Sequence, residues 1–324
     1  MRRALTLAAA LLAVGLGLLA ANPAAVAQFS AFVAGPTALA SYTGPGDLTS
    51  WTAWVGNRPY KASYANSASH PAINITRTSD SHTCDLMTSA TAGLGNTVNC
   101  SSGADNAQSA ASFCASTTCI PTIGTGWYDQ TKNAACTGSC DLTAGWSGTQ
   151  FQLALTGING LPGLQTSANP GFMQTASGHN FTPSAAVVSM TGVTCRISGT
   201  QEFLIVQTNG AQNRIKELSN ASPIVFGTFG GTSGSVTENS NDTTCHSVIG
   251  VVGSGTGNSL IAVDGSITTG TVTGNTTAGR PLIPQNNGVN TVLIGEAGFI
   301  DNVALSSSTI ASVYGNQKSF WGTP

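Results

Sequence analysis

The chain has 324 residues, of which 41% are hydrophobic and only 7% are charged, with 11 Lys and Arg against 13 Asp and Glu. So few basic residues cannot form the positive surface that binding to nucleic acid or to an anionic membrane requires, so both are excluded as partners. Polar residues without charge dominate instead, which suits a β-rich protein that meets neutral ligands, and the length is ample for a large core.

The chain begins with a pattern typical of a secretory signal peptide. Two arginines precede an apolar run over residues 5–21, and Ala25-Val26-Ala27 provides an A-x-A cleavage site. The alternative is a membrane anchor, but the run of about 17 residues is shorter than the roughly 20 that a spanning helix needs. We expect a signal peptide over residues 1–27, no membrane span, and a secreted protein, extracellular or periplasmic, that begins at Gln28.

Runs of roughly four to eight β-branched and aromatic residues alternate with Gly and Pro along the rest of the chain and predict β-strands. The dipeptide Asp264-Gly265 lies between two such runs and predicts a two-residue hairpin, because both positions tolerate a positive φ. Short helices are expected around residues 105–115 and 307–316. No disordered linker and no long repeat interrupts the pattern, so we expect one all-β domain over residues 28–324. The expected strands, in chain order, cover residues 72–77, 151–155, 185–190, 203–207, 247–252, 259–263 and 292–294.

Eight cysteines follow the leader, and an even number in an exported chain predicts disulfides, because the compartment is oxidising. The alternative is a metal site at the C-x4-C and C-x3-C pairs, but neither has the C-x2-C form of zinc knuckles and no histidine lies at ligand spacing from them. We therefore expect no metal. Eight cysteines allow roughly a hundred pairings, so the connectivity stays open. Proximity along the chain suggests Cys84–Cys100, Cys114–Cys119, Cys136–Cys140 and Cys195–Cys245.

Several kinds of catalytic site are disfavoured by the motifs that the chain lacks. It has no G-x-S-x-G motif, which argues against a serine hydrolase. The glycine-rich stretch over residues 253–257 is not followed by a lysine, so a hairpin tip is a better interpretation than a phosphate-binding loop. Carboxylates and aromatic side chains remain, and these are the residues that sugar chemistry uses.

Cleavage of a glycosidic bond needs a carboxylic acid that protonates the leaving oxygen and a second carboxylate that acts as nucleophile or base. Glu296 follows a β run and Gly295, so its side chain is a candidate for an inward-facing acid with a raised pKa. The alternative is that Glu296 pairs with a buried polar group or with Arg280. Glu217 is the second candidate, and its alternative is a solvated charged turn.

Aromatic residues gather in the first half of the chain. Their faces can stack on sugar rings while their polar atoms reach hydroxyl groups. The alternative for at least half of them is packing in the core. The aromatic residues concerned are Trp51, Trp54, Tyr60, Trp127, Tyr128 and Trp146.

The segment FCASTTCIPTIGTGWYDQ, residues 113–130, resembles the catalytic domain of α-L-arabinofuranosidase B, in which a Cys-x4-Cys loop precedes a strand that ends in Tyr-Asp-Gln. Residues 62–80 resemble an early strand of that family, and residues 292–324 resemble its closing strands and final helix. The resemblance implies a bridge between Cys114 and Cys119. It also implies a concanavalin A-like, laminin-G-like jelly-roll sandwich of two antiparallel sheets with one or two short covering helices.

The resemblance further implies an exported carbohydrate-active protein that hydrolyses terminal arabinofuranosyl side chains of polysaccharides. Glu217 would be the nucleophile and Glu296 a substitute for the family's acid, because residues 285–295 carry no carboxylate where that acid is expected. No metal or organic cofactor is needed for this reaction. The expected partner is a polysaccharide or oligosaccharide, and the oligomeric state stays open. The expected substrate-binding residues are Trp127, Tyr128, Asp129, Gln130 and Trp146.

Two alternatives remain beside hydrolysis. One is a non-catalytic glycan-binding or surface-interaction domain, in which Trp127, Tyr128 and Trp146 make the contact. The other is an exported β domain with a structural role only. If the protein is a hydrolase, Asp129 would either orient the substrate or brace the loop in which it lies.

Overall fold

The computed structural model divides the chain into two compact units, Met1–Tyr42 and Thr43–Pro324. The expected signal peptide lies outside the described residues, and the account below concerns the second unit. No helix in the described part of the chain is long and apolar enough to cross a membrane. The structure describes residues 42–65, 70–88, 97–100, 103, 105–115, 117–131, 140–144, 151–166, 173–175, 187–198, 202–207, 212–217, 224–229, 235–240, 245–253, 258–272, 274, 279–283 and 291–324.

The largest sheet has eight strands in the order β17-β16-β15-β10-β19-β8-β7, with β1 beside β19. The predicted turn at Asp264-Gly265 is confirmed, with φ of 49° and 85°, and joins β16 to β17. Asn159-Gly160 forms a second turn of this kind between β7 and β8. The strands are β1 (Ala53–Gly56), β7 (Phe151–Ile158), β8 (Leu161–Thr166), β10 (Val188–Ser198), β15 (Cys245–Val252), β16 (Ser259–Val263), β17 (Ser266–Gly270) and β19 (Thr291–Asp301).

A seven-stranded sheet, in the order β14-β13-β12-β11-β18-β9-β6, faces the first sheet. Val248 and Ile261 of the first sheet share one apolar cluster with Ile215 and Val236 of the second. Gly250 lets the two layers approach, because a Cβ there would lie 2.8 Å from Cγ1 of Ile215. The expected all-β sandwich is therefore confirmed. Its strands are β6 (Thr143–Ala144), β9 (Met173–Gln174), β11 (Glu202–Gln207), β12 (Gln212–Glu217), β13 (Ile224–Phe229), β14 (Ser235–Ser240) and β18 (Arg280–Ile283).

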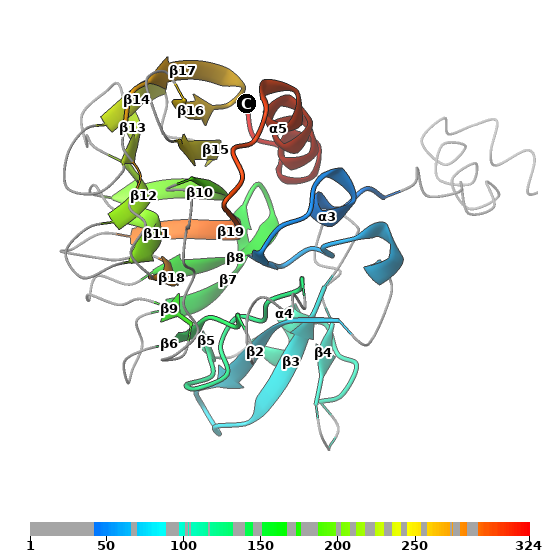
Figure 1. Ribbon diagram of the computed structural model, residues 1–324. Coiled ribbons are helices and arrows are strands. Elements are labelled where there is room, and N and C mark those ends of the chain that lie inside the picture. Colours follow the sequence, from blue (N-terminus) through cyan, green and yellow to red (C-terminus); the bar gives the residue numbers. More distant parts are fainter. Residues whose placement is uncertain are drawn as a thin grey trace, which may run out of the picture. The chain divides into compact units, whose positions relative to one another are not determined.

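A third sheet, in the order β4-β3-β2-β5, adds to the two that were expected (Figure 1). One of its faces is apolar, with Ile73, Ile75 and Leu86 fully buried in the same cluster as the core of the sandwich. The helix expected around residues 105–115 is limited to α4 (Ala110–Phe113), which begins after its N-cap Ser109. The strands are β2 (Pro71–Arg77), β3 (Thr83–Met87), β4 (Val98–Asn99) and β5 (Cys119–Pro121).

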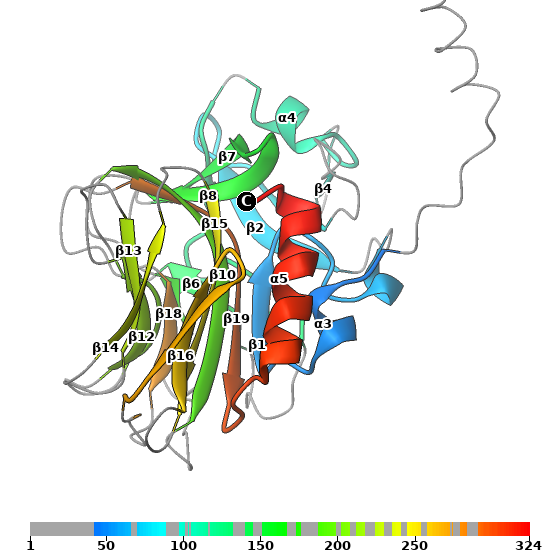
Figure 2. The same cartoon turned by 90° about the horizontal axis from the view of Figure 1, so that it is seen from above.

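Helix α5 (Ser307–Trp321) covers the face of the eight-stranded sheet that points away from the seven-stranded sheet (Figure 2). Ser306 caps it by accepting a hydrogen bond from the Thr309 amide, and Gly322 ends it with φ of 67°. Its buried residues Ile310 and Val313 pack with apolar side chains of β15 and with Trp51. The short helices α3 (Pro45–Leu48) and η1 (Ala62–Tyr64) precede and follow β1.

A bulge in β19 decides which residues of that strand face the helix. The register with β10 shifts between Val193, opposite Glu296, and Thr194, opposite Ile294, so Gly295 is the additional residue. Val292 and Ile294 before the bulge, and Ala297 and Phe299 after it, lie in the core between the sheets. The side chain of Glu296 therefore lies on the helix side of the sheet.

Candidate functional site

Trp127 opens the Trp-Tyr-Asp-Gln segment and is part of the core. Its side chain is fully buried, and its backbone forms bridges with Ile73 and with Leu142. The backbone amide of Trp127 donates to the Leu142 carbonyl at 2.8 Å. Trp127 thus packs in the core, which was the alternative to stacking on a sugar ring.

Tyr128 is only half-buried, whereas the other three residues of the Trp-Tyr-Asp-Gln segment are buried. Its hydroxyl donates to Oδ1 of Asp85 at 2.8 Å, and the same oxygen accepts a hydrogen bond from Nδ2 of Asn74 at 2.7 Å. Burial, and then the hydrogen bond to Asp85, raises the pKa of Tyr128 well above its usual value. Tyr128 therefore remains a neutral hydrogen-bond donor.

Asp129 and Gln130 point into the protein and hold β1 and the loop after it. Oδ1 of Asp129 accepts from the amides of Trp54 and Thr131, each at 3.0 Å. Gln130 donates to the Gly56 carbonyl at 2.6 Å and accepts from the Tyr60 amide at 2.9 Å. Burial raises the pKa of the Asp129 carboxyl. Of the two roles expected for Asp129, its contacts are those of a brace.

Glu296 is fully buried and forms an ion pair with the equally buried Arg58. Nε of Arg58 donates to Oε2, Nη2 donates to Oε1 at 2.7 Å, and Nε2 of Gln317 also donates to Oε1 at 3.0 Å. The expected alternative, a buried polar partner, is therefore present, with Arg58 rather than Arg280. No carboxylate oxygen of Glu296 reaches solvent in this arrangement.

Glu217 lies in a different sheet from Glu296. Glu217 is the last residue of β12 and stands opposite Phe226 of β13. The side chain of Glu217 is outside the described part of the structure. Trp146 and Cys136 lie outside the described residues altogether. The structure thus gives the backbone position of the expected nucleophile and does not bring the two expected catalytic carboxylates into one described group.

Three of the expected disulfides are present. Cys84 is bonded to Cys100, Cys114 to Cys119, and Cys195 to Cys245. Cys140 is disulfide-bonded as well. The predicted pairings are confirmed for these three bridges, including the one that the family resemblance implied.

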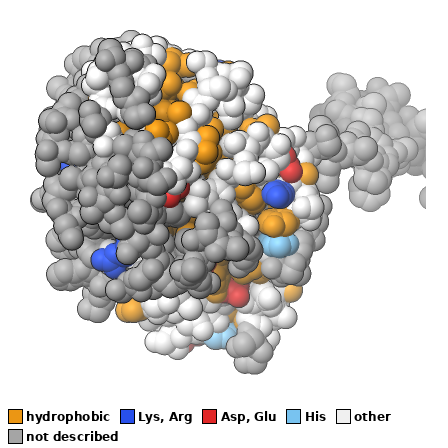
Figure 3. Space-filling model, in the orientation of Figure 1, with side chains coloured by type: hydrophobic (Ala, Val, Ile, Leu, Met, Phe, Trp, Pro, Cys, Tyr) orange, Lys and Arg blue, Asp and Glu red, His pale blue; other side chains and the backbone are white. Residues whose placement is uncertain are grey.

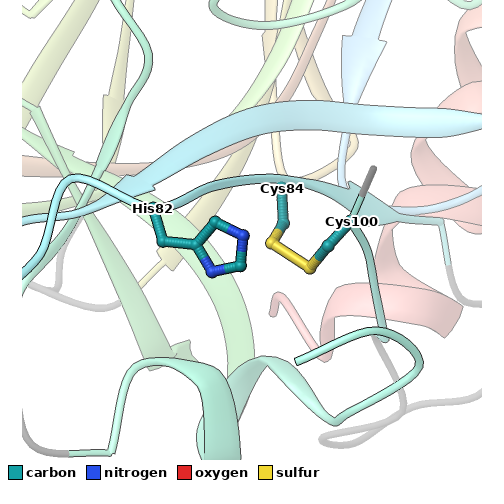
Figure 4. A group of neighbouring side chains, drawn as sticks. All are labelled: His82, Cys84 and Cys100. Atoms are coloured by element: carbon teal, nitrogen blue, oxygen red, sulfur yellow. A yellow bond between two sulfur atoms is a disulfide. The ribbon is translucent and has the colours of Figure 1, made fainter. Parts of the chain in front are cut away.

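The side chain of His82 lies beside the Cys84–Cys100 disulfide (Figure 4). His82, Cys84 and Cys100 are all residue types that can bind a metal ion. Their ligand atoms all lie within 4.8 Å of one another. Because the two sulfurs are bonded to each other, neither is a thiolate, and thiolate is the form of cysteine that binds metals. In its oxidised form this group is a disulfide beside an imidazole.

On the face of the molecule seen in Figure 3, the described residues include few charged side chains, and these are scattered among uncharged ones. One exposed cluster joins Arg77 to Asp80 at 2.6 Å and to Asp105 at 2.9 Å. The hydrogen bond from Arg77 lowers the pKa of Asp80 to about 2. This surface fits the expectation of a neutral ligand better than that of a charged one.

The sequence interpretation missed Asn74, Asp85, Arg58 and Gln317, which hold the residues that it did single out. Asp85 lies in the strand TCDLM, where a polar residue between apolar neighbours is typical of a half-exposed strand, so a local signal for Asp85 existed. Arg58 and Gln317 had no such signal, because each meets Glu296 only through the fold.

No protein-family profile and no curated protein matches the chain. Among solved structures, a glutamate-to-glutamine mutant of a GH54 α-L-arabinofuranosidase soaked with 4-nitrophenyl α-L-arabinofuranoside matches with a TM-score of 0.59 at 15% identity, covering 86% of this chain and 66% of that one. An arabinofuranosidase complexed with arabinofuranosyl-α-1,2-xylobiose matches with a TM-score of 0.58 at 16% identity, over 86% of this chain and 65% of that one.

A GH54 α-L-arabinofuranosidase soaked with a cyclic sulfate inhibitor gives a TM-score of 0.57 at 17% identity, over 86% of this chain and 66% of that one. The chain thus spans slightly less than two thirds of the length of these enzymes. At such low identity the likeness is one of fold. This chain has an all-β fold similar to that of GH54 arabinofuranosidases.

Proposed function

We propose that this chain is an exported, arabinofuranosidase-like protein that acts on arabinofuranosyl side chains of polysaccharides. The observation that supports the proposal most is the fold match over 86% of the chain to an enzyme soaked with an arabinofuranoside. The three disulfides support export, because such bridges persist in oxidising compartments. The low charge and the exposed hydroxyl and amide groups suit a neutral sugar.

In the hydrolytic form of this function, Glu217 is the nucleophile. Its position at the end of β12, where the chain leaves the sheet, suits a residue that contacts a ligand, because binding and catalytic residues concentrate where loops meet a rigid scaffold. The role of acid is harder to assign to Glu296. To protonate a leaving oxygen, this carboxylate would have to leave Arg58 and Gln317 and reach solvent.

The second candidate function is binding of the same saccharide without cleavage, and the buried ion pair of Glu296 favours it. A two-carboxylate mechanism fails without its acid. The half-exposed group of Tyr128, Asp85 and Asn74 offers a phenol, a carboxylate and an amide on one face, which are side chains that hydrogen-bond sugar hydroxyls. Binding of a saccharide does not require Glu296 to act as an acid.

A nitrophenol-release assay on 4-nitrophenyl α-L-arabinofuranoside tests the proposal. We expect activity in the unmodified protein and a loss of about a thousandfold or more in Glu217→Gln, since loss of a nucleophile removes the covalent route. Glu238→Gln is the matched control, because Glu238 lies on β14 of the same sheet and accepts a hydrogen bond from Thr268. This control should retain its activity.

Calorimetric titration with an arabinofuranosyl-substituted xylo-oligosaccharide separates the remaining outcomes. Binding without nitrophenol release would support the second candidate and reject hydrolysis. Equal activity in Glu217→Gln and the unmodified protein would reject Glu217 as nucleophile. If the protein neither binds the oligosaccharide nor releases nitrophenol, action on arabinofuranosides is rejected altogether.

A further inference from the structure

The sheet β4-β3-β2-β5 places a histidine beside a pair of cross-strand cysteines. His82 immediately precedes β3, Cys84 lies within it, and Cys100 follows β4. Because Asp85 pairs with Asn99 in the antiparallel ladder, Cys84 and Cys100 stand opposite each other. Both cysteines are buried, at 2% and 6% exposure, whereas the His82 side chain is 30% exposed.

The imidazole of His82 is held in one orientation. Its Nδ1 lies 2.7 Å from Oδ2 of Asp105. Asp105 is fixed in turn, because Nη2 of Arg77 donates to Oδ2 at 2.9 Å and Nε2 of Gln108 donates to Oδ1 at 3.0 Å. The other ring nitrogen, Nε2, faces the two sulfur atoms (Figure 4).

A carboxylate that holds one nitrogen of a histidine while the other faces two cysteines is an arrangement found around bound zinc. Zinc prefers thiolate sulfur and imidazole nitrogen, and a ligating histidine usually donates its second N–H to a carboxylate or carbonyl. Asp105 already has that position. The disulfide alone separates this group from a Cys2His donor set.

We propose that reduction of the Cys84–Cys100 disulfide turns His82, Cys84 and Cys100 into a binding site for one zinc ion. The reductant is a dithiol, which supplies two electrons and two protons, becomes a cyclic disulfide, and leaves two cysteine thiols. Zinc then displaces the two thiol protons, is bound by both sulfurs and by Nε2 of His82, and takes a water molecule as its fourth ligand. Asp105 is a positioning residue that acts through His82.

The consequence is that β3 stays tied to β4 in both redox states. The covalent bridge joins the two strands in the oxidised protein, and the metal joins them in the reduced one. Metal binding of this kind stabilises the folded state, because the ligands are brought together only in that state.

Cobalt titration of the full protein, reduced with a dithiol that is then removed under anaerobic conditions, tests the proposal. The unmodified protein should bind one equivalent with a thiolate-to-cobalt charge-transfer band and the ligand-field bands of tetrahedral cobalt. H82A should lose the tetrahedral bands, and D105N should bind cobalt about 10- to 100-fold more weakly. The double variant C84A/C100A controls for all the other thiols, which it retains, and should lose the charge-transfer band.

An unchanged charge-transfer band in C84A/C100A, or unchanged affinity in H82A, would overturn the proposal. A second measurement applies if the chain unfolds when its disulfides are reduced. In that case one equivalent of zinc should restore the β-sheet circular dichroism of the reduced unmodified protein and not that of reduced H82A. Equal recovery in the two proteins, or recovery in neither, would also overturn it.

Discussion

Glu296 and Arg58 compensate each other's charge in a place where neither charge meets water. Both side chains are fully buried, and the carboxylate also accepts a hydrogen bond from Gln317 of α5. Gln317 continues the network, because its Nε2 also donates to Thr191 and its Oε1 accepts from Ser247. The pair therefore links the loop after β1, the strand β19 and the helix. Removal of one partner leaves the other as an unpaired buried charge, which is costly.

We expect Glu296→Gln to lower the free energy of unfolding by about 3–5 kcal/mol, because Arg58 loses its counter-charge in the interior. Urea denaturation followed by tryptophan fluorescence measures this change. Asp80→Asn is the matched control, since it breaks the exposed pair with Arg77, and it should change stability far less. A Glu296→Gln protein as stable as the unmodified one would contradict the structural role of the pair.

Individual residues were predictable where their neighbours in sequence define them, and unpredictable where the fold supplies the partner. The Tyr-Asp-Gln frame was identified from a short segment, yet Trp54, a partner of Asp129, and Tyr60, a partner of Gln130, lie 75 and 70 residues away along the chain. Arg58 and Glu296 are separated by 238 residues. No local pattern connects such positions, so Arg280 was an equally reasonable partner until the strands were arranged.

Two positions of β19 must be glycine because aromatic side chains pack directly on the strand there. A Cβ at Gly298 would lie 2.8 Å from Cε3 of Trp51 and would also collide with the ring of Trp54. At Gly295, a Cβ would lie 2.8 Å from Cη2 of Trp321. Both glycines thus leave room for indole rings on the outer face of the sheet.

The expectation of a strand at residues 292–294 was correct but too short, since β19 runs from Thr291 to Asp301. Its second half, GEAGF, is rich in small residues and contains a charge, so the β pattern weakens there. The aromatic cover that explains these residues comes from distant segments. The Asn159-Gly160 turn, by contrast, carried a local hairpin signal in the sequence and was missed.

Gly298→Ala should destabilise the protein by about 1–3 kcal/mol, because the added methyl group overpacks the contact with the two tryptophans. Gly315→Ala is the matched control: Gly315 is exposed in α5, and nothing lies within 4 Å of a Cβ at that position. This control should raise the stability by roughly 0.5–1 kcal/mol, since alanine is the better helix former. The midpoints of thermal unfolding of the two variants, measured in parallel, test this prediction. Equal shifts of the two midpoints in the same direction would contradict the packing argument.

For the molecule as a whole, composition and strand pattern predicted the all-β sandwich, and the cysteine count predicted an oxidised chain. The third sheet was not predicted, because β4 and β5 are too short to produce a periodic signal. The jelly-roll connectivity stays a prediction. The order of strands depends on pairings such as that of β1 with β19, which arise only when the whole chain is folded.

The disulfides should differ in how much they stabilise the fold, because they close chain segments of very different length. Cys195–Cys245 closes 50 residues and Cys114–Cys119 closes 5. In the chain-entropy model, loss of the first costs about 4 kcal/mol and loss of the second about 2 kcal/mol. Denaturant unfolding of C195A/C245A and of C114A/C119A compares the two. Equal losses would show that unfolded-state entropy is not what distinguishes these bridges.

The position of β19 in its sheet also governs when the protein can acquire its structure during synthesis. This strand separates β10 from β8 and pairs with β1, whose residue Ala53 stands opposite Phe299. Until the ribosome has added Asp301, the two halves of the largest sheet have no strand between them, and α5 has no complete surface to cover. Such dependence on distant pairing makes folding slow. A growing chain therefore cannot complete its main sheet until nearly all of its residues have been synthesised.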